Sequence, residues 1–208
     1  MKTIAVTIGI GSMHKQMAEW AAEKVRQYLD LETRIIGDEH MCYAMPNVPS
    51  PKNIWTIKFN LFDIYPDTDR IMYFDNDWRP VRAFNINDYC TDHTKLYFVR
   101  DRIYRPEVRA AAKSYNINPD NYFNGGWFMS HRQHQPLFQK CKETYHRFKE
   151  TWGDQCVMNQ VLFDSVTLLP QEINTLDFNY LTANKVLGFH SNISRYIAAK
   201  KQEDYNWN

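Results

Sequence analysis

Short apolar runs alternate along the chain with segments whose apolar residues recur every three or four positions. Runs of the first kind predict buried strands, and segments of the second kind predict helices. The first such unit is a strand over 2–8, a helix from Met13 to Leu29 and a second strand over 33–37. An opening βαβ unit of this kind is typical of nucleotide-binding α/β domains.

The same alternation continues to residue 190 and predicts one α/β domain. Further strands are expected over 69–74, 95–99, 127–129, 166–169 and 185–190. Further helices are expected over 54–65, 106–115 and 135–148, and from Asp154 onward. The last residues, 200–208, are polar and are expected to form a frayed tail.

One apolar run ends abruptly in carboxylates, because Ile71 to Phe74 is followed by Asp75 and Asp77. The carboxyl ends of strands in an α/β sheet open onto the crevice where such sheets bind ligands. Two carboxylates at that edge repel each other unless a cation or a proton lies between them, and hard divalent cations prefer oxygen ligands. The pattern therefore favours a metal–diphosphate site. The alternative is a solvated turn with an Asx cap.

Two other segments suit a phosphate-bearing ligand. The turn Gly9-Ile10-Gly11 lets a ligand approach the backbone, and the helix that follows favours an anion at its start. A tight strand–helix turn explains the same glycines. Lys58 lies on or beside the apolar face of its helix. It can direct a cation at a diphosphate or at the two acids, or simply extend its charged end into solvent.

Three later positions are polar groups at the ends or starts of elements. Asn124 and Gly125-Gly126 precede an apolar strand and suit a sugar hydroxyl, but a β-bulge is the alternative. Asp154 begins a helix and can be its N-cap. His190 ends the last strand, where a histidine is a hydrogen-bonded structural residue unless acids lie nearby.

Composition limits the possible functions. The chain has 208 residues, of which 44% are hydrophobic and 24% charged, as expected for one globular domain. Its net charge is +1, so no overall field attracts nucleic acid. No apolar stretch approaches the roughly 20 residues that cross a bilayer. The four cysteines have neither metal nor redox spacing, and no signal peptide is recognised, so a soluble cytoplasmic protein with free thiols is expected.

Taken in order, these motifs resemble the glycogenin-like family of retaining glycosyltransferases, roughly from Ile4 to His190. The motifs are Val6-Thr7-Ile8-Gly9, Lys58, the run Ile71-Met72-Tyr73-Phe74-Asp75-Asn76-Asp77, Phe123-Asn124-Gly125-Gly126, the pair Asp154-Gln155 and the late His190. The resemblance implies a GT-A (Rossmann-like) fold, which is a three-layer α/β/α domain with a mixed, mostly parallel central sheet. It would occupy residues 1–199.

The resemblance also implies roles for individual residues. Asp75, Asp77 and His190 would bind Mn²⁺ or Mg²⁺, and Asp154 and Gln155 would lie beneath the anomeric carbon as catalytic residues. Donor-binding residues would be Thr7, Ile8, Gly9, Lys58, Asp75, Asn76, Asp101, Asn124 and Gly125. The family's glycine and lysine after the histidine are missing, and Arg195 is expected to replace that lysine against the diphosphate.

The function implied is transfer of a hexose from a nucleotide sugar, UDP-linked, to a carbohydrate or other hydroxyl acceptor, with a homodimer possible. Two alternatives remain open. A nucleotidyltransferase shares the sheet and an acid-bound metal, but the loop Gly9 to Lys15 is a poor match to its triphosphate-binding loop. A non-catalytic nucleotide-sugar-binding module is expected to have lost an acid or an amide, and all are present here.

Overall fold

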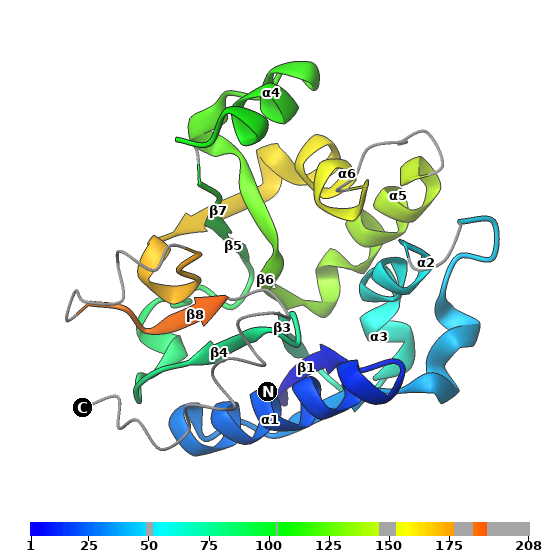
Figure 1. Ribbon diagram of the computed structural model, residues 1–208, viewed down its shortest axis with the longest axis vertical. Coiled ribbons are helices and arrows are strands. Elements are labelled where there is room, and N and C mark those ends of the chain that lie inside the picture. The colour runs from blue at the N-terminus through cyan, green and yellow to red at the C-terminus, as the bar shows by residue number, and fades with distance from the viewer. Residues whose placement is uncertain (49–51, 103, 146–152, 177–184, 191–208) are drawn as a thin grey trace.

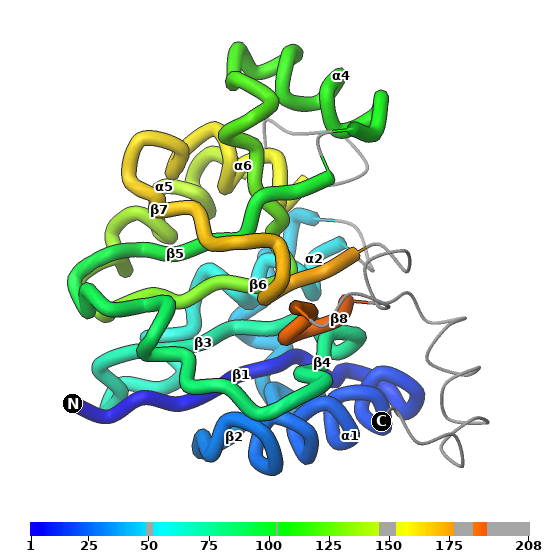
Figure 2. Tube along the Cα trace, turned by 90° about the vertical axis from the view of Figure 1, so that its left-hand side faces the viewer, coloured from blue at the N-terminus to red at the C-terminus, as the bar shows by residue number. Residues whose placement is uncertain are grey.

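The computed structural model describes residues 1–48, 52–102, 104–145, 153–176 and 185–190. Its centre is a six-stranded sheet in the order β2-β1-β3-β6-β5-β7. The strands are β1 (Thr3–Ile8), β2 (Thr33–Ile36), β3 (Arg70–Phe74), β5 (Leu96–Arg100), β6 (Phe123–His131) and β7 (Val166–Leu169). Figure 2 shows these strands following one another in this order.

The sheet is mixed. The pairs β1–β2, β1–β3 and β5–β7 are parallel, and β6 is antiparallel to both β3 and β5. The expected mixed, mostly parallel sheet is therefore confirmed. A second, two-stranded sheet pairs β4 (Trp78–Pro80) with β8 (Gly188–His190) in antiparallel fashion.

Helices lie on both faces of the large sheet (Figure 1). They are α1 (Ser12–Leu29), α2 (Lys52–Trp55), α3 (Leu61–Ile64), α4 (Pro106–Ser114), α5 (Gln135–Tyr145) and α6 (Gly153–Leu162). The α1 helix contacts β1 and β2, and α6 contacts β6.

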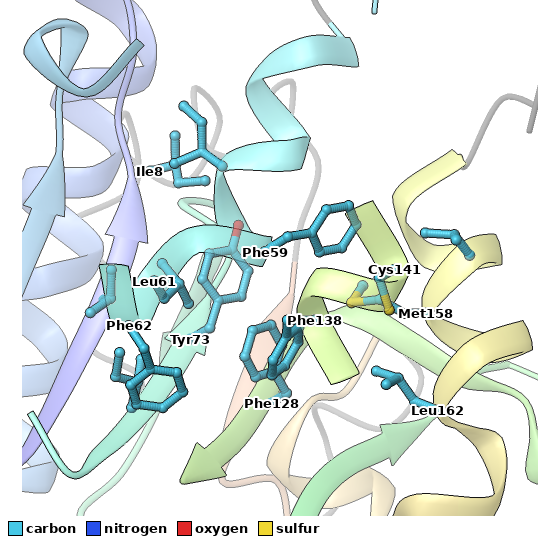
Figure 3. Packing of buried hydrophobic residues seen from close by; sticks show 14 of the residues in the cluster. Ile8, Phe59, Leu61, Phe62, Tyr73, Phe128, Phe138, Cys141, Met158 and Leu162 are labelled. Carbon is cyan, nitrogen blue, oxygen red and sulfur yellow. The ribbon is translucent and has the colours of Figure 1, made fainter. Parts of the chain in front are cut away.

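Alternate residues of the strands enter different apolar clusters, as the two-residue period of a strand requires. Ile71 and Tyr73 of β3 pack with residues of α5, α6 and the segment 56–62, the cluster drawn in Figure 3. Met72 and Phe74 pack into the other cluster, which includes Ala21 and other residues of α1. Because both faces of the sheet are covered, the expected three-layer α/β/α architecture is confirmed.

The single helix expected over 54–65 is wrong. The chain forms α2, a 3₁₀ segment from Thr56 to Asn60, and α3. All five residues of the 3₁₀ segment are buried. Thr56 accepts a hydrogen bond from the Met45 N–H at 2.9 Å, and the Asn60 amide donates to the Tyr43 carbonyl at 2.8 Å. These bonds to a distant segment compete with a regular helix.

The structure also describes the cysteines and the apolar character of the helices. All four cysteines are free, as expected. Among the described residues, none of the helices combines the length and the apolar character needed to span a membrane. The expected polar tail over 200–208 lies outside the described residues.

Candidate functional site

A cavity of about 540 Å³ lies where β1 and β3 end. Ile8 is the last residue of β1, and Asp75 follows β3 directly. Eleven of the predicted site residues line this cavity, namely Ile8, Lys58, Asp75, Asn76, Asp77, Asp101, Asn124, Gly125, Asp154, Gln155 and His190. Thr7 and Gly9 are not on its wall. Arg195 lies outside the described residues.

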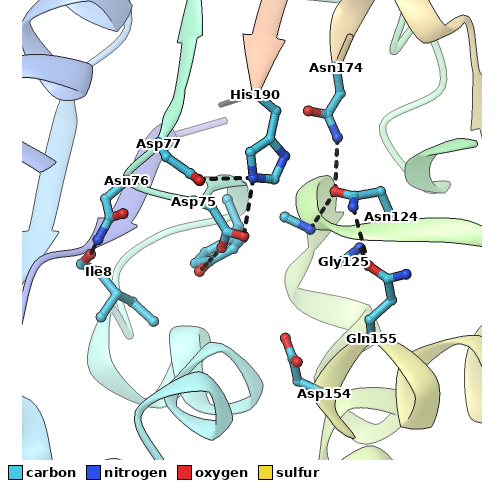
Figure 4. A network of polar contacts seen from close by, with 12 residues as sticks. Ile8, Asp75, Asn76, Asp77, Asn124, Gly125, Asp154, Gln155, Asn174 and His190 are labelled. Atoms are coloured by element: carbon cyan, nitrogen blue, oxygen red, sulfur yellow. Dashed lines mark hydrogen bonds and ion pairs between the residues drawn. The ribbon is translucent and has the colours of Figure 1, made fainter. Parts of the chain in front are cut away.

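The two acids and the late histidine converge, although more than a hundred residues separate them in the sequence (Figure 4). One ligand atom each from Asp75, Asp77 and His190 lies within 4.8 Å of the others. His190 Nε2 is 2.9 Å from Asp77 Oδ1 and 3.7 Å from Asp75 Oδ2. The β4–β8 pairing, which places Trp78 opposite His190, produces this approach.

The surroundings of this cluster fit a divalent cation. Two carboxylates and an imidazole are a donor set that suits Mn²⁺, and the two carboxylates also suit Mg²⁺. Burial lowers the pKa of His190, but the carboxylates of Asp77 and Asp75 outweigh burial and hold it above its usual value. A Cβ atom on Gly126 would lie 2.5 Å from Asp75 Oδ2 and would also collide with the His190 ring. Gly126 therefore keeps the space around these ligand atoms open.

Lys58 is not the solvent-directed lysine of the alternative interpretation, because its side chain is 3% exposed. Its Nζ donates to Asp154 Oδ2 at 2.7 Å and to the Gly125 carbonyl at 3.2 Å, and lies 3.6 Å from Asp75 Oδ1. Burial lowers the pKa of Lys58, but Asp154 and Asp75 raise it more, and the net shift is upward. Lys58 thus stays charged and joins Asp154 to the metal-binding acids.

Gln155 connects the other polar residues of the cavity. Its Oε1 accepts from the Gly125 N–H at 3.0 Å and from the Asn124 amide at 3.2 Å. Its Nε2 donates to Asp101 Oδ2 at 2.7 Å. Asn124 Oδ1 in turn accepts from the Asn174 amide at 3.0 Å. Asp101, Asn124 and Gln155 therefore hold each other in place along one wall.

The strand pairing is also irregular at the 124–126 segment, as the β-bulge alternative requires. These residues belong to β6 itself, and the β5–β6 register shifts between Phe98 and Val99. Asn124 and Gly125 nevertheless line the cavity. The irregular pairing and the polar wall occur together, so the two interpretations do not exclude each other.

The first strand contributes less than expected. The Thr7 side chain is fully buried. A Cβ on Gly9 would lie 2.7 Å from the Cβ of Ala18, so packing against α1 accounts for this glycine. Asn76 lines the cavity, and its amide donates to the Ile8 carbonyl at 2.8 Å.

Several cavity residues were missed at the level of sequence, namely His14, Trp55, Arg102, Arg105 and Leu176. None of them belongs to a motif of its own. Lys15, the residue that kept the nucleotidyltransferase alternative open, is exposed and is not on the cavity wall.

Comparisons with known proteins agree with this architecture. No protein-family model matches the chain, and no curated protein matches it. Among solved structures, the galactosyltransferase LgtC, crystallised with donor and acceptor sugar analogues, is similar over 89% of this chain and 86% of its own, with a TM-score of 0.66 and 15% identity. The bifunctional glycosyltransferase WbbM is similar over 91% of this chain and 45% of its own, with a TM-score of 0.60 and 16% identity. The chain therefore has the GT-A fold of these glycosyltransferases.

Proposed function

We propose that this chain is a metal-dependent glycosyltransferase that transfers a hexosyl group from a UDP-linked sugar to a hydroxyl acceptor with retention of configuration. One observation carries the proposal. Asp75, Asp77 and His190 meet in the cavity that also contains Asp154 and Gln155. A cation site and a carboxylate–amide pair in one cavity are what departure of a diphosphate from a sugar requires.

The cation site is assigned to Asp75, Asp77 and His190, holding Mn²⁺ or Mg²⁺. A bound cation of this kind neutralises the negative charge that builds up on a leaving diphosphate. Arg195 is proposed to contact the same diphosphate. The backbone of Thr7, Ile8 and Gly9 is proposed to hold the uracil and ribose, because Ile8 lines the cavity and its carbonyl is fixed by Asn76.

The sugar is assigned to the wall on which Gln155 is the central residue. Asp101, Asn124 and Gly125 present carboxylate, amide and backbone groups that suit sugar hydroxyls. Asp154 and Gln155 are proposed to lie beneath the anomeric carbon, where a carboxylate stabilises developing positive charge electrostatically. Lys58 fixes the Asp154 carboxylate at 2.7 Å and is proposed to position the donor through it.

The nucleotidyltransferase alternative is weaker because Lys15 does not line the cavity. The non-catalytic alternative is weaker because the acids and amides assigned to the site all line it. The domain is proposed to span residues 1–199. The homodimer and the cytoplasmic location remain predictions of the sequence.

A thermal-shift comparison of UDP, ADP, GDP and CDP, each with Mn²⁺ or with EDTA, tests the proposal. A ligand that binds the native state raises the melting temperature, and at a concentration of 100 Kd it stabilises by about 2.7 kcal/mol. We expect the largest rise in melting temperature with UDP and Mn²⁺ together. In Asp77→Asn, the rise with UDP should be the same in Mn²⁺ as in EDTA. The matched control is Asp164→Asn, which changes an exposed acid away from the cavity. If no nucleoside diphosphate shifts the melting temperature, the proposal is wrong.

A further inference from the structure

The cavity wall next to Asp101 carries two arginines that no motif predicted. Arg102 and Arg105 both line the cavity, and both follow β5 in the sequence. Their side chains are 21% and 44% exposed, so they lie at its rim. Asp101 Oδ2 is bonded to Gln155, which places this rim beside the proposed sugar site.

Three of the four acids at the site have other partners, and Asp101 is the acid that lies 3.6 Å from Arg102 Nε. Asp154 is paired with Lys58, and Asp75 and Asp77 face His190. Asp101 accepts from Gln155 and from the Arg102 backbone N–H at 2.6 Å.

The guanidinium groups themselves have weak partners. Arg102 Nε is 3.6 Å from Asp101 Oδ1, which is too long for a hydrogen bond. This buried Nε has no hydrogen-bond partner among the residues that the structure describes. Arg105 pairs with Glu107 at 3.4 Å, but that pair is half exposed and contributes little. Both guanidinium groups therefore keep donors for an additional anion.

A smaller hollow adjoins this rim, because Arg102 and Leu176 line both cavities. Its other walls include Arg100, Tyr104 and Asn174. The Tyr104 side chain is 52% exposed and offers an aromatic surface. Asn174 is buried, and its Oδ1 has no hydrogen-bond partner within the described parts of the chain. Such an atom is suited to accept a bond from a ligand hydroxyl.

We infer that the acceptor is an anionic saccharide, one that carries a phosphate or a carboxylate, and that Arg102 and Arg105 bind this group at the cavity rim. The planar, multidentate guanidinium fork matches both anions. The inference rests on the proposed function, since it names the acceptor class of the same site. It assigns the diphosphate to the metal cluster and not to these arginines.

The test uses the full chain loaded with UDP and Mg²⁺ and labelled with ¹⁵N at arginine. Glucose 6-phosphate, glucuronate and glucose are titrated separately, and the Nε–H signals of Arg102 and Arg105 are followed by NMR. Single Arg→Gln variants assign the signals. We expect both anionic sugars to shift the two signals at concentrations at least about tenfold lower than glucose does, because charge-assisted hydrogen bonds are stronger than neutral ones.

The variant carrying Arg102→Gln and Arg105→Gln is expected to lose this preference while it still binds UDP and Mg²⁺. The matched control is Arg34→Gln on β2, at the opposite edge of the sheet. The inference is overturned if the anionic sugars produce no response, if glucose acts equally well, if the preference survives in the double variant, or if the double variant no longer binds UDP. Failure of the unmodified chain to bind UDP and Mg²⁺ would instead reject the proposed function.

Discussion

Tyr73 decides which oxygen of Asp75 faces the other metal-binding residues. Its hydroxyl donates to Asp75 Oδ1 at 2.7 Å, and Lys58 Nζ lies 3.6 Å from the same oxygen. Asp75 Oδ2 is left on the side of His190. Burial, reinforced by the neighbouring Asp75 carboxylate, raises the pKa of Tyr73 well above its usual value, so the hydroxyl remains a donor. Tyr73 is thus a positioning residue for the cation site.

Replacing Tyr73 with phenylalanine is expected to weaken Mn²⁺ binding about 10- to 100-fold, the usual effect of losing a group that orients a metal ligand. The fold should persist, because the ring still stacks on Phe128 at a centroid distance of 4.9 Å. Calorimetric titration of Mn²⁺ into the UDP-bound protein measures the affinity. The matched control is Tyr28→Phe, on α1 and away from the cavity. Equal Mn²⁺ affinity in Tyr73→Phe and the unmodified protein would show that the hydroxyl does not orient Asp75.

Lys58 and Asp154 form a buried ion pair, and removing one partner leaves an uncompensated charge. Lys58→Met is therefore expected to lower the free energy of unfolding by about 3–5 kcal/mol. In the unmodified protein the net effect of burial and of the two acids is to raise the pKa of Lys58, so the stabilisation is present at neutral pH and is lost as the pH rises through that pKa. The deficit of Lys58→Met should therefore shrink as the pH is raised into the strongly alkaline range.

Denaturant unfolding at several pH values measures both effects. The double variant Lys58→Met with Asp154→Asn is the control, since it removes both charges of the 2.7 Å pair. It should be more stable than Lys58→Met alone. If instead the two changes destabilise additively, the pair does not interact in the way its 2.7 Å contact indicates.

At the level of elements, what the sequence could predict depended on whether the pattern was local. The strands β1 and β3 and the helix α1 were predicted because their apolar periodicity is complete within a few residues. The prediction of one helix over 54–65 was wrong because Thr56 and Asn60 form hydrogen bonds with residues 43–45. The β4 strand, with Arg79 and Pro80 among its three residues, has no pattern of its own and exists only through its pairing with β8.

The same distinction applies to the site. Asp75, Asp77, Asn124, Asp154, Gln155 and His190 belong to motifs, and the structure brings them to one cavity. Arg102 and Arg105 match no motif in the sequence, and only the tertiary structure shows that they line the cavity with Asp101. Conversely, Thr7 and Gly9 belong to a motif, but the Thr7 side chain is buried and Gly9 allows close packing against Ala18 of α1.

Strand β6 places Gly126 opposite Asp75, whose N–H donates to the Gly126 carbonyl at 2.8 Å. Gly126→Ala is expected to abolish the metal-dependent thermal shift, because the added methyl group would occupy the space between Asp75 and His190. The control is Gly37→Ala, where the methyl group meets only the flexible carboxylate end of Glu39. A full metal response in Gly126→Ala would place the cation elsewhere.

At the scale of the whole molecule, the candidate cation site joins the segment that follows β3 to β8, the last strand of the described chain. The β4–β8 sheet is three residue pairs long and is extended by bonds from residues 172–175, including Thr175 to Gly188 at 2.9 Å. The neighbouring β3 is bonded on both sides within the large sheet. A short two-stranded sheet is marginally stable by itself, so β8 is expected to open more often than β3.

Ligand binding should remove this difference locally. With UDP and Mn²⁺ bound, opening β8 would break a ligand–protein contact through His190, and each opening would cost additional free energy. Hydrogen–deuterium exchange read by mass spectrometry should then show slower exchange in peptides covering 78–81 and 187–190, with little change in β3. Removing the metal with EDTA should restore fast exchange, and Asp77→Asn should exchange fast with or without metal. A uniform slowing across the molecule would indicate general stabilisation and would contradict a cation held between β4 and β8.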